Sequence, residues 1–202
     1  MTDSVFASAV TAFTQLVADL PDTCWDGPGL GEWDMRALVG HTSRSLITVS
    51  EYLRTPAEHE DVADAVGYYV WVRDYTAAAG AEAVAERGRA AGRALGADPV
   101  ATVDALAERA LADVRAAGDP LISVIGGMGI RLSTYLQTRV FELAVHGLDI
   151  ARAAGRAFTP PSEVLEQTTV LAARVAVRFG QGETVLTALT GRSTLPPGYS
   201  VV

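Results

Sequence analysis

The segment Arg139–Ile150, RVFELAVHGLDI, has the apolar content of a core helix but also contains four charged or polar residues. These residues are Arg139, Glu142, His146 and Asp149. Burying such a side chain costs several kcal/mol unless it is paired, hydrogen-bonded or bound to a metal. At about 100° per residue, their spacing places all four within an arc of about 80° on one helix face. The segment therefore predicts a long helix with a single polar stripe.

The residues around the stripe predict that this helix is buried. Leu143 and Ile150 project into the same sector as the stripe, and apolar side chains cover the rest of the circumference: Leu136, Val140, Phe141, Val145 and Leu148. A helix that is apolar all round is a buried helix. Residues 81–95 differ, because their charged face is backed by alanine and glycine, which is typical of an exposed helix.

The stripe has two interpretations that spacing alone does not separate. Glu142 and His146 are an i,i+4 pair, so their side chains meet on one face and can bind a divalent cation together. The same spacing also permits a structural salt-bridge network that joins Arg139 to Glu142 and His146 to Asp149. A metal site requires at least one further ligand from another element.

Only three histidines are available, and one of them can supply that ligand. His59 lies in the polar segment PAEHED and is expected to be solvated, whereas His41 lies in a predicted helix on the same side as Tyr52. His41 would complete a His/Glu/His site if the two helices adjoin, although a lone histidine there is also typical of a core residue. Carboxylate and imidazole ligands suit zinc, nickel, manganese or iron.

Composition limits the class of protein. The chain has 202 residues, 49% hydrophobic and 20% charged, which predicts a globular domain with a substantial core. Its net charge of -8 and scattered arginines argue against nucleic acid as a partner. Cys24 is the only cysteine, and we find neither a signal-peptide pattern nor a membrane-spanning apolar run. We therefore expect a soluble cytoplasmic protein.

Apolar periodicity predicts an all-α protein, most simply an up-and-down bundle with additional helices. We expect helices over residues 3–20, 34–54, 62–79, 81–95, 100–117, 130–154 and 162–179, and either a short strand or an extended entry at 121–125. Asp34, Asp98 and Ser162 are the expected N-terminal caps, and Gly155 ends the long helix. We assign residues 1–180 to the bundle and 181–202 to a C-terminal tail that docks or frays.

One aromatic cluster has no assigned role. Tyr68, Tyr69, Trp71 and Tyr75 follow one another within a predicted helix and could line a pocket or an interface, although such stripes more often belong to a core. Whether the chain forms a homodimer stays open at this point.

Two segments together resemble a known family. GEWDMRALVGHTSRSL, residues 31–46, and RVFELAVHGLDIARAAG, residues 139–155, are similar to the N-terminal domain of mycothiol-dependent maleylpyruvate isomerases. That domain belongs to the wider DinB-like metalloprotein superfamily. The resemblance covers about residues 6–157 and a short motif, VLTALTGR, at residues 185–192.

The resemblance implies a DinB-like four-helix bundle that holds a divalent ion, usually zinc, through His41, Glu142 and His146. It also implies that mycothiol, a low-molecular-weight bacterial thiol, is a co-substrate. Asp149 would support His146, and Arg139 would neutralise Glu142 or bind an anionic substrate. The isomerase carries a second domain, and we expect that domain to be absent because about 45 residues follow Ala157.

Three functions fit these observations. The first is a metal- and thiol-dependent transferase or isomerase that acts on a small electrophile. The second is a non-catalytic helical module that binds a small ligand or a protein. The third is a metal hydrolase that needs no thiol. No catalytic residue is assigned from the sequence.

Overall fold

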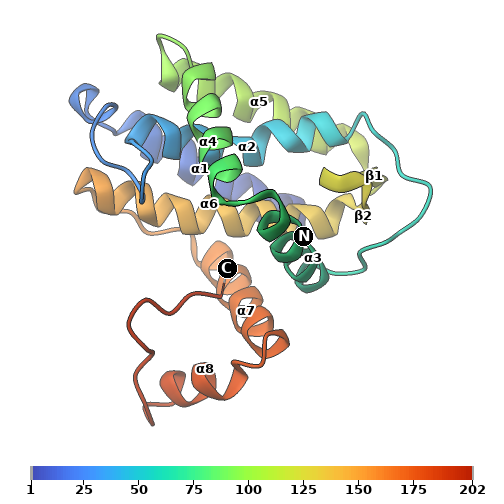
Figure 1. Ribbon diagram of the computed structural model, residues 1–202. Coiled ribbons are helices and arrows are strands. Elements are labelled where there is room, and N and C mark those ends of the chain that lie inside the picture. The colour runs from blue at the N-terminus through green and yellow to red at the C-terminus, as the bar shows by residue number, and fades with distance from the viewer. Residues whose placement is uncertain (1, 202) are drawn as a thin grey trace.

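Four long helices pack side by side around the apolar core, in a computed structural model that describes residues 2–201 (Figure 1). They are α1 (Thr2–Ala18), α2 (Met35–Tyr52), α5 (Pro99–Ala117) and α6 (Leu132–Ala154). Their facing sides bury large apolar residues, including Phe6, Phe13, Leu38, Leu46 and Leu136. The predicted all-α bundle is confirmed.

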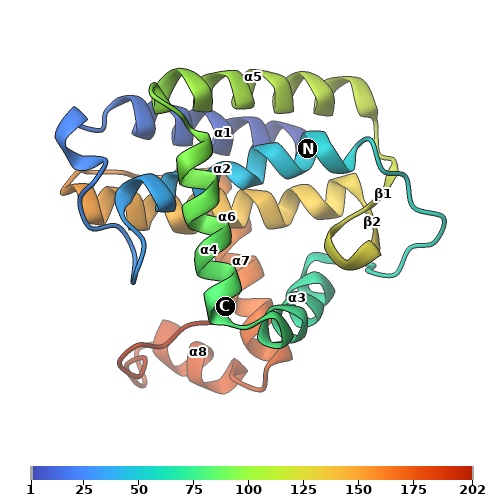
Figure 2. The same cartoon turned by 45° about the horizontal axis from the view of Figure 1, so that its top comes forward.

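Two further helices connect the second and third helices of the bundle. They are α3 (Ala65–Ala79) and α4 (Ala81–Ala94), and α4 crosses the bundle helices at a steep angle (Figure 2). Because the connection runs through α3 and α4, α2 and α5 point in the same direction, opposite to α1 and α6 (Figure 2). The bundle therefore does not alternate direction at every step.

The crossing of α4 over α2 depends on two glycines. A Cβ added to Gly40 would lie 2.3 Å from the backbone nitrogen of Gly92, and one added to Gly92 would lie 2.8 Å from the Cα of Ala37. Only glycine permits backbones to approach so closely. This contact holds α4 over the part of α2 that carries His41.

Substituting Gly40 by alanine should lower the free energy of unfolding by about 1–3 kcal/mol, because the two helices must separate to admit the methyl group. The melting temperature should fall by several degrees in a thermal denaturation followed by circular dichroism. Gly67→Ala is the matched control: its Cβ would meet nothing closer than 3.5 Å, so stability should stay level or increase. Equal destabilisation by both substitutions would contradict the assigned helix contact.

Most predicted helix boundaries are confirmed. Asp34 accepts a hydrogen bond from Ala37 N at 2.7 Å, and Asp98 accepts one from Ala101 N at 3.0 Å. Gly155 ends α6 in the left-handed conformation, with φ of 62°. Ser162 is not the cap of its helix, because it is already the first helical residue and follows Pro161 without a capping hydrogen bond.

Short elements join the helices at both ends of the bundle. Of the two alternatives expected at 121–125, the strand is present as β1 (Leu121–Ser123), which pairs antiparallel with β2 (Gly129–Arg131) around a turn of 3-10 helix, Ile125–Gly127. A second 3-10 turn spans Asp22–Cys24. Because residues 129–131 form β2, α6 begins at Leu132, two residues later than predicted.

The C-terminal region lies against the α3 side of the bundle as α7 (Ser162–Arg178) and α8 (Gly182–Leu189) (Figure 1). Helix α8 was not predicted, since residues from 181 were assigned to a tail. Leu186 and Leu189 on α8 are exposed, so this helix contributes little to a buried core. The domain boundary at residue 180 stays a prediction. Within residues 2–201, no helix is both long and apolar enough to cross a membrane.

Candidate metal centre

The polar stripe of α6 faces the interior of the protein, between α2 and α3. Leu143 and Ile150 beside the stripe are completely buried, as predicted. Leu148 is 41% exposed, however, so one face of α6 is accessible to solvent. Arg139 is nevertheless buried, and Glu142, His146 and Asp149 are half-buried, so the stripe residues are mostly shielded from solvent and depend on protein partners.

His41 from α2 meets Glu142 and His146 from α6. The ligand atoms of these three side chains all lie within 4.8 Å of one another. The imidazole rings of His41 and His146 meet edge to face, with centroids 5.0 Å apart. The two helices thus adjoin as the His/Glu/His interpretation requires, and the three residues form a group that could hold a metal ion.

Glu142 is held as a carboxylate by its neighbours. The Tyr69 hydroxyl from α3 donates to Glu142 Oε1 at 2.8 Å, and His146 Nε2 lies 3.4 Å from Oε2. Burial alone would raise the pKa of Glu142, but the hydrogen bond from His146 and the charge of Arg139 lower it to about 2. The carboxylate is therefore charged at all physiological pH values.

His146 lies between two carboxylates. Its Nδ1 is 3.3 Å from Asp149 Oδ2, on the opposite side of the ring from Glu142. Burial lowers the pKa of His146, but the hydrogen bonds to Asp149 and Glu142 outweigh it and raise the pKa to about 9. The predicted contact between His146 and Asp149 is confirmed, and it fixes the orientation of the ring.

His41 has a different environment. The indole of Trp33 packs against its ring at a centroid distance of 4.4 Å, and its buried Nδ1 has no hydrogen-bond partner among residues 2–201. Burial and the neighbouring His146 lower the pKa of His41 to about 4. A neutral, partly unsatisfied imidazole is suited to donate a nitrogen lone pair to a cation.

Arg139 does not pair with Glu142. It is 9% exposed, and its guanidinium lies over the rings of Tyr135 and Tyr68, at 4.7 and 5.7 Å from their centroids. Its nitrogens donate to the Thr138 and Tyr68 hydroxyl oxygens, and no ion pair with a carboxylate forms in the described part of the chain. The first half of the salt-bridge interpretation is therefore wrong, whereas the second half is present.

A cavity of about 210 Å³ opens on these residues. Its wall includes the three candidate ligands and three arginines, Arg44, Arg87 and Arg139. Glu142 is the only carboxylate in this wall. The cavity is thus locally positive in a chain whose net charge is -8, which favours anionic groups inside it.

The donor set fits a divalent metal ion. Two imidazoles and one carboxylate are ligands that zinc accepts, and three protein ligands leave room for water or substrate. The unsatisfied His41 Nδ1 also shows that this histidine lacks the partner expected of an ordinary core residue. A metal that binds here would have to displace the proton that His146 carries.

Two residues of this site were not assigned to it from the sequence. Tyr69 belongs to the aromatic cluster whose role stayed open, and Trp33 was not among the candidate site residues. Tyr68 and Tyr69 are buried, Trp71 is half-buried and Tyr75 is exposed, so the cluster divides between core and surface. His59 is exposed on its loop, as expected.

A known family model matches more than half of the chain. The model of the mycothiol maleylpyruvate isomerase N-terminal domain family matches residues 6–151, which include all three candidate ligands. The chain belongs to this family. No curated protein matches the sequence.

A solved structure shares the fold of this family member. The crystal structure of the mycothiol-dependent maleylpyruvate isomerase superposes with a TM-score of 0.54 and 15% sequence identity. The match covers 87% of this chain and 68% of that chain. At this level of identity the likeness establishes the fold of the family and leaves the activity of this member to be inferred from its site.

Replacing Tyr69 by phenylalanine should weaken metal binding about 10–100-fold, as is typical when a partner that orients a ligand is lost. The phenol is buried beside Glu142, so the substitution removes the hydrogen bond to Oε1 without changing the shape of the site. Competition with a chromophoric chelator measures the change. Tyr75→Phe, at an exposed position of the same helix, is the control; equal affinities of the two variants would contradict the role of Tyr69.

Proposed function

We propose that this chain is a divalent-metal-dependent enzyme that uses a low-molecular-weight thiol, mycothiol, to modify or isomerise a small electrophile. The observation that carries the proposal is the convergence of His41, Glu142 and His146 on a cavity with a positive wall. Membership of a family named for a mycothiol-dependent isomerase supports the choice of thiol. Zinc is the ion we expect, with nickel, manganese or iron as alternatives.

The protein side of the chemistry follows from the contacts. A divalent cation at this site would lower the pKa of a thiol and polarise a carbonyl group. Asp149 holds the ring of His146 in place, and Tyr69 holds Glu142 through one oxygen so that the other faces His146. These contacts fix the direction of two of the three donor groups before any ligand arrives.

Arg139 supplies a fixed positive charge for the electrophile. Its guanidinium is buried, always protonated and without a carboxylate partner in the described residues. The charge of Glu142 is close enough to stabilise the guanidinium but makes no ion pair with it, so a ligand carboxylate in the cavity would give Arg139 a direct partner. We therefore propose an anionic electrophile, with Arg139 as its anchor.

A non-catalytic module is the second candidate, and one observation favours it. Without any ion, His146 already bridges Glu142 and Asp149 as a charged pair network. Such a network could serve as a structural element beneath a cavity that binds a small ligand or a protein segment.

Thermal denaturation with and without mycothiol and a chelator separates the two candidates. If the enzyme proposal holds, mycothiol should raise the melting temperature of the metal-loaded protein and have no effect after chelation. Stabilisation that survives chelation, or no stabilisation at all, would favour the non-catalytic module. Glutathione, added at the same concentration, tests whether the response is specific to the thiol.

A further inference from the structure

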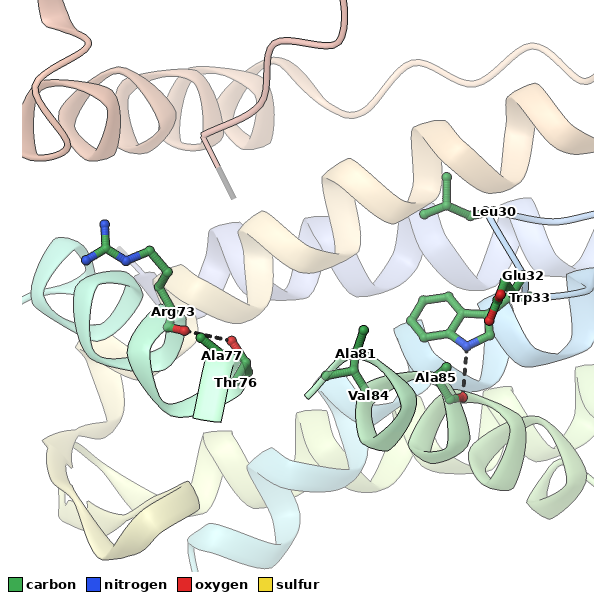
Figure 3. Close-up of a pocket in the computed structure, with 9 residues that line it drawn as sticks. All are labelled: Leu30, Glu32, Trp33, Arg73, Thr76, Ala77, Ala81, Val84 and Ala85. Atoms are coloured by element: carbon green, nitrogen blue, oxygen red, sulfur yellow. Dashed lines mark hydrogen bonds between the residues drawn. The ribbon is translucent and has the colours of Figure 1, made fainter. Parts of the chain in front are cut away.

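A second, larger hollow lies beside the cavity of the candidate metal centre. It has a volume of about 680 Å³ and runs between the loop before α2, the end of α3 and the start of α4 (Figure 3). In Figure 3, Trp33 stands at one end and Thr76 at the other, with Ala81, Val84 and Ala85 between them. We call this hollow the outer groove.

The outer groove adjoins the metal centre at two residues. Thr76 lines both the outer groove and the 210 Å³ cavity. Trp33 forms part of the groove wall and packs against His41 with its ring. The indole is fixed there, because its Nε1 donates to the Ala85 carbonyl at 2.9 Å (Figure 3). Gly88 leaves room for the ring, since a Cβ at that position would lie 2.5 Å from Trp33.

The two spaces differ in chemistry. The inner cavity is lined by histidines, arginines and tyrosine hydroxyls, whereas alanine, valine, leucine and tryptophan side chains dominate the groove. The charged groups of the groove are Glu32 and Arg73, and Arg73 is already engaged by Asp74 and by the ring of Phe179. The groove therefore offers burial to apolar groups and few polar partners.

The volumes of the inner cavity and the outer groove indicate which part of a ligand each can hold. The inner cavity has a volume of about seven water molecules at roughly 30 Å³ each, enough for a small polar head. The outer groove lies within the range of volumes typical of small-molecule sites. A ligand longer than its reactive head must extend beyond the inner cavity, and the groove is a neighbouring space that shares Thr76 with the cavity wall.

We propose that the electrophilic substrate is elongated, with its polar reactive end in the inner cavity and an apolar substituent in the outer groove. This inference rests on the proposed function, since it places the reactive end at the metal centre. Specificity for the substituent then comes from burial against Ala81, Val84 and Trp33.

The test uses the full, zinc-loaded chain and straight-chain hydroxamates, which bind a metal at one end. Calorimetry would compare acetohydroxamate with hexanohydroxamate. Burial of two or more methylenes in the groove should make hexanohydroxamate bind at least about tenfold more tightly. The ratio of the two affinities should fall to about one in Ala81→Trp, where the new ring fills the groove.

Ala90→Trp is the matched control, because Ala90 is also an exposed alanine of α4 but does not line the groove. Its ratio should equal that of the wild type. A ratio near one in the wild type, or the same ratio in Ala81→Trp and Ala90→Trp, would overturn the groove assignment while leaving the metal centre intact. Failure of the wild-type protein to bind zinc at all would overturn both proposals.

Discussion

The His41→Ala protein should contain almost no divalent metal when it is purified like the wild type, which should contain about one equivalent per chain. His41 supplies the only ligand atom from α2, so its loss leaves two protein ligands on a single helix. The loss of affinity should exceed the 10–100-fold typical of a residue that only orients a ligand. Elemental analysis of the purified proteins measures the difference.

His41 is the sharpest position for this test because the buried Nδ1 makes no hydrogen bond. Its removal therefore breaks no polar network, in contrast to His146→Ala, which leaves Glu142 and Asp149 without their shared partner. His59→Ala, at the exposed third histidine, is the control and should retain its metal. Full metal occupancy in both His41→Ala and His146→Ala would show that the ion binds at another site.

Metal affinity should increase about tenfold for each pH unit up to about pH 9 and then level off. A metal ligand must be deprotonated, and the pKa of about 9 means that His146 carries a proton at neutral pH in the metal-free protein. With pKa values of about 4 and 2, His41 and Glu142 are already deprotonated there. Only one proton competes with the metal between about pH 5 and pH 9, and the affinity gain from pH 7 to pH 9 should be about fiftyfold, because half of His146 is still protonated at a pH equal to its pKa.

Calorimetry in buffers of different ionisation enthalpy counts this proton directly, and about one should be released at pH 7. In Asp149→Asn, a contact that raises the pKa of His146 is lost, so the affinity should level off at a lower pH. An affinity that does not change between pH 7 and pH 9, or the same levelling pH in Asp149→Asn, would contradict the assigned environment of His146.

Local signals in the sequence were sufficient for most of the fold. Asp34 and Asp98 cap helices because an aspartate side chain satisfies a free backbone N–H wherever a helix starts. Gly155 ends α6 for an equally local reason. The crossing of α4 over α2 was not predictable, because the contact of Gly40 with Gly92 joins residues that no periodicity relates.

The candidate site was likewise predictable from the sequence only where its residues lie close together along the chain. The i,i+4 spacing of Glu142 and His146 fixes their neighbourhood within α6, and the i,i+3 spacing does the same for His146 and Asp149. The contribution of Tyr69 arises from α3, which the chain brings to α6 only through its tertiary fold. Glu142 lies at helical spacing from Arg139, but the guanidinium packs on the rings of Tyr68 and Tyr135, because those aromatic side chains fill the space around it.

The central claim is that a thiol reaches a metal held by His41, Glu142 and His146, and cobalt substitution tests it most directly. Cobalt(II) takes the place of zinc and absorbs light, and a sulfur ligand adds a charge-transfer band to its spectrum. Adding mycothiol to the cobalt-loaded wild-type protein should produce this band, with a stoichiometry of about one thiol per metal. A cobalt-loaded protein whose spectrum does not change at saturating mycothiol would contradict the account.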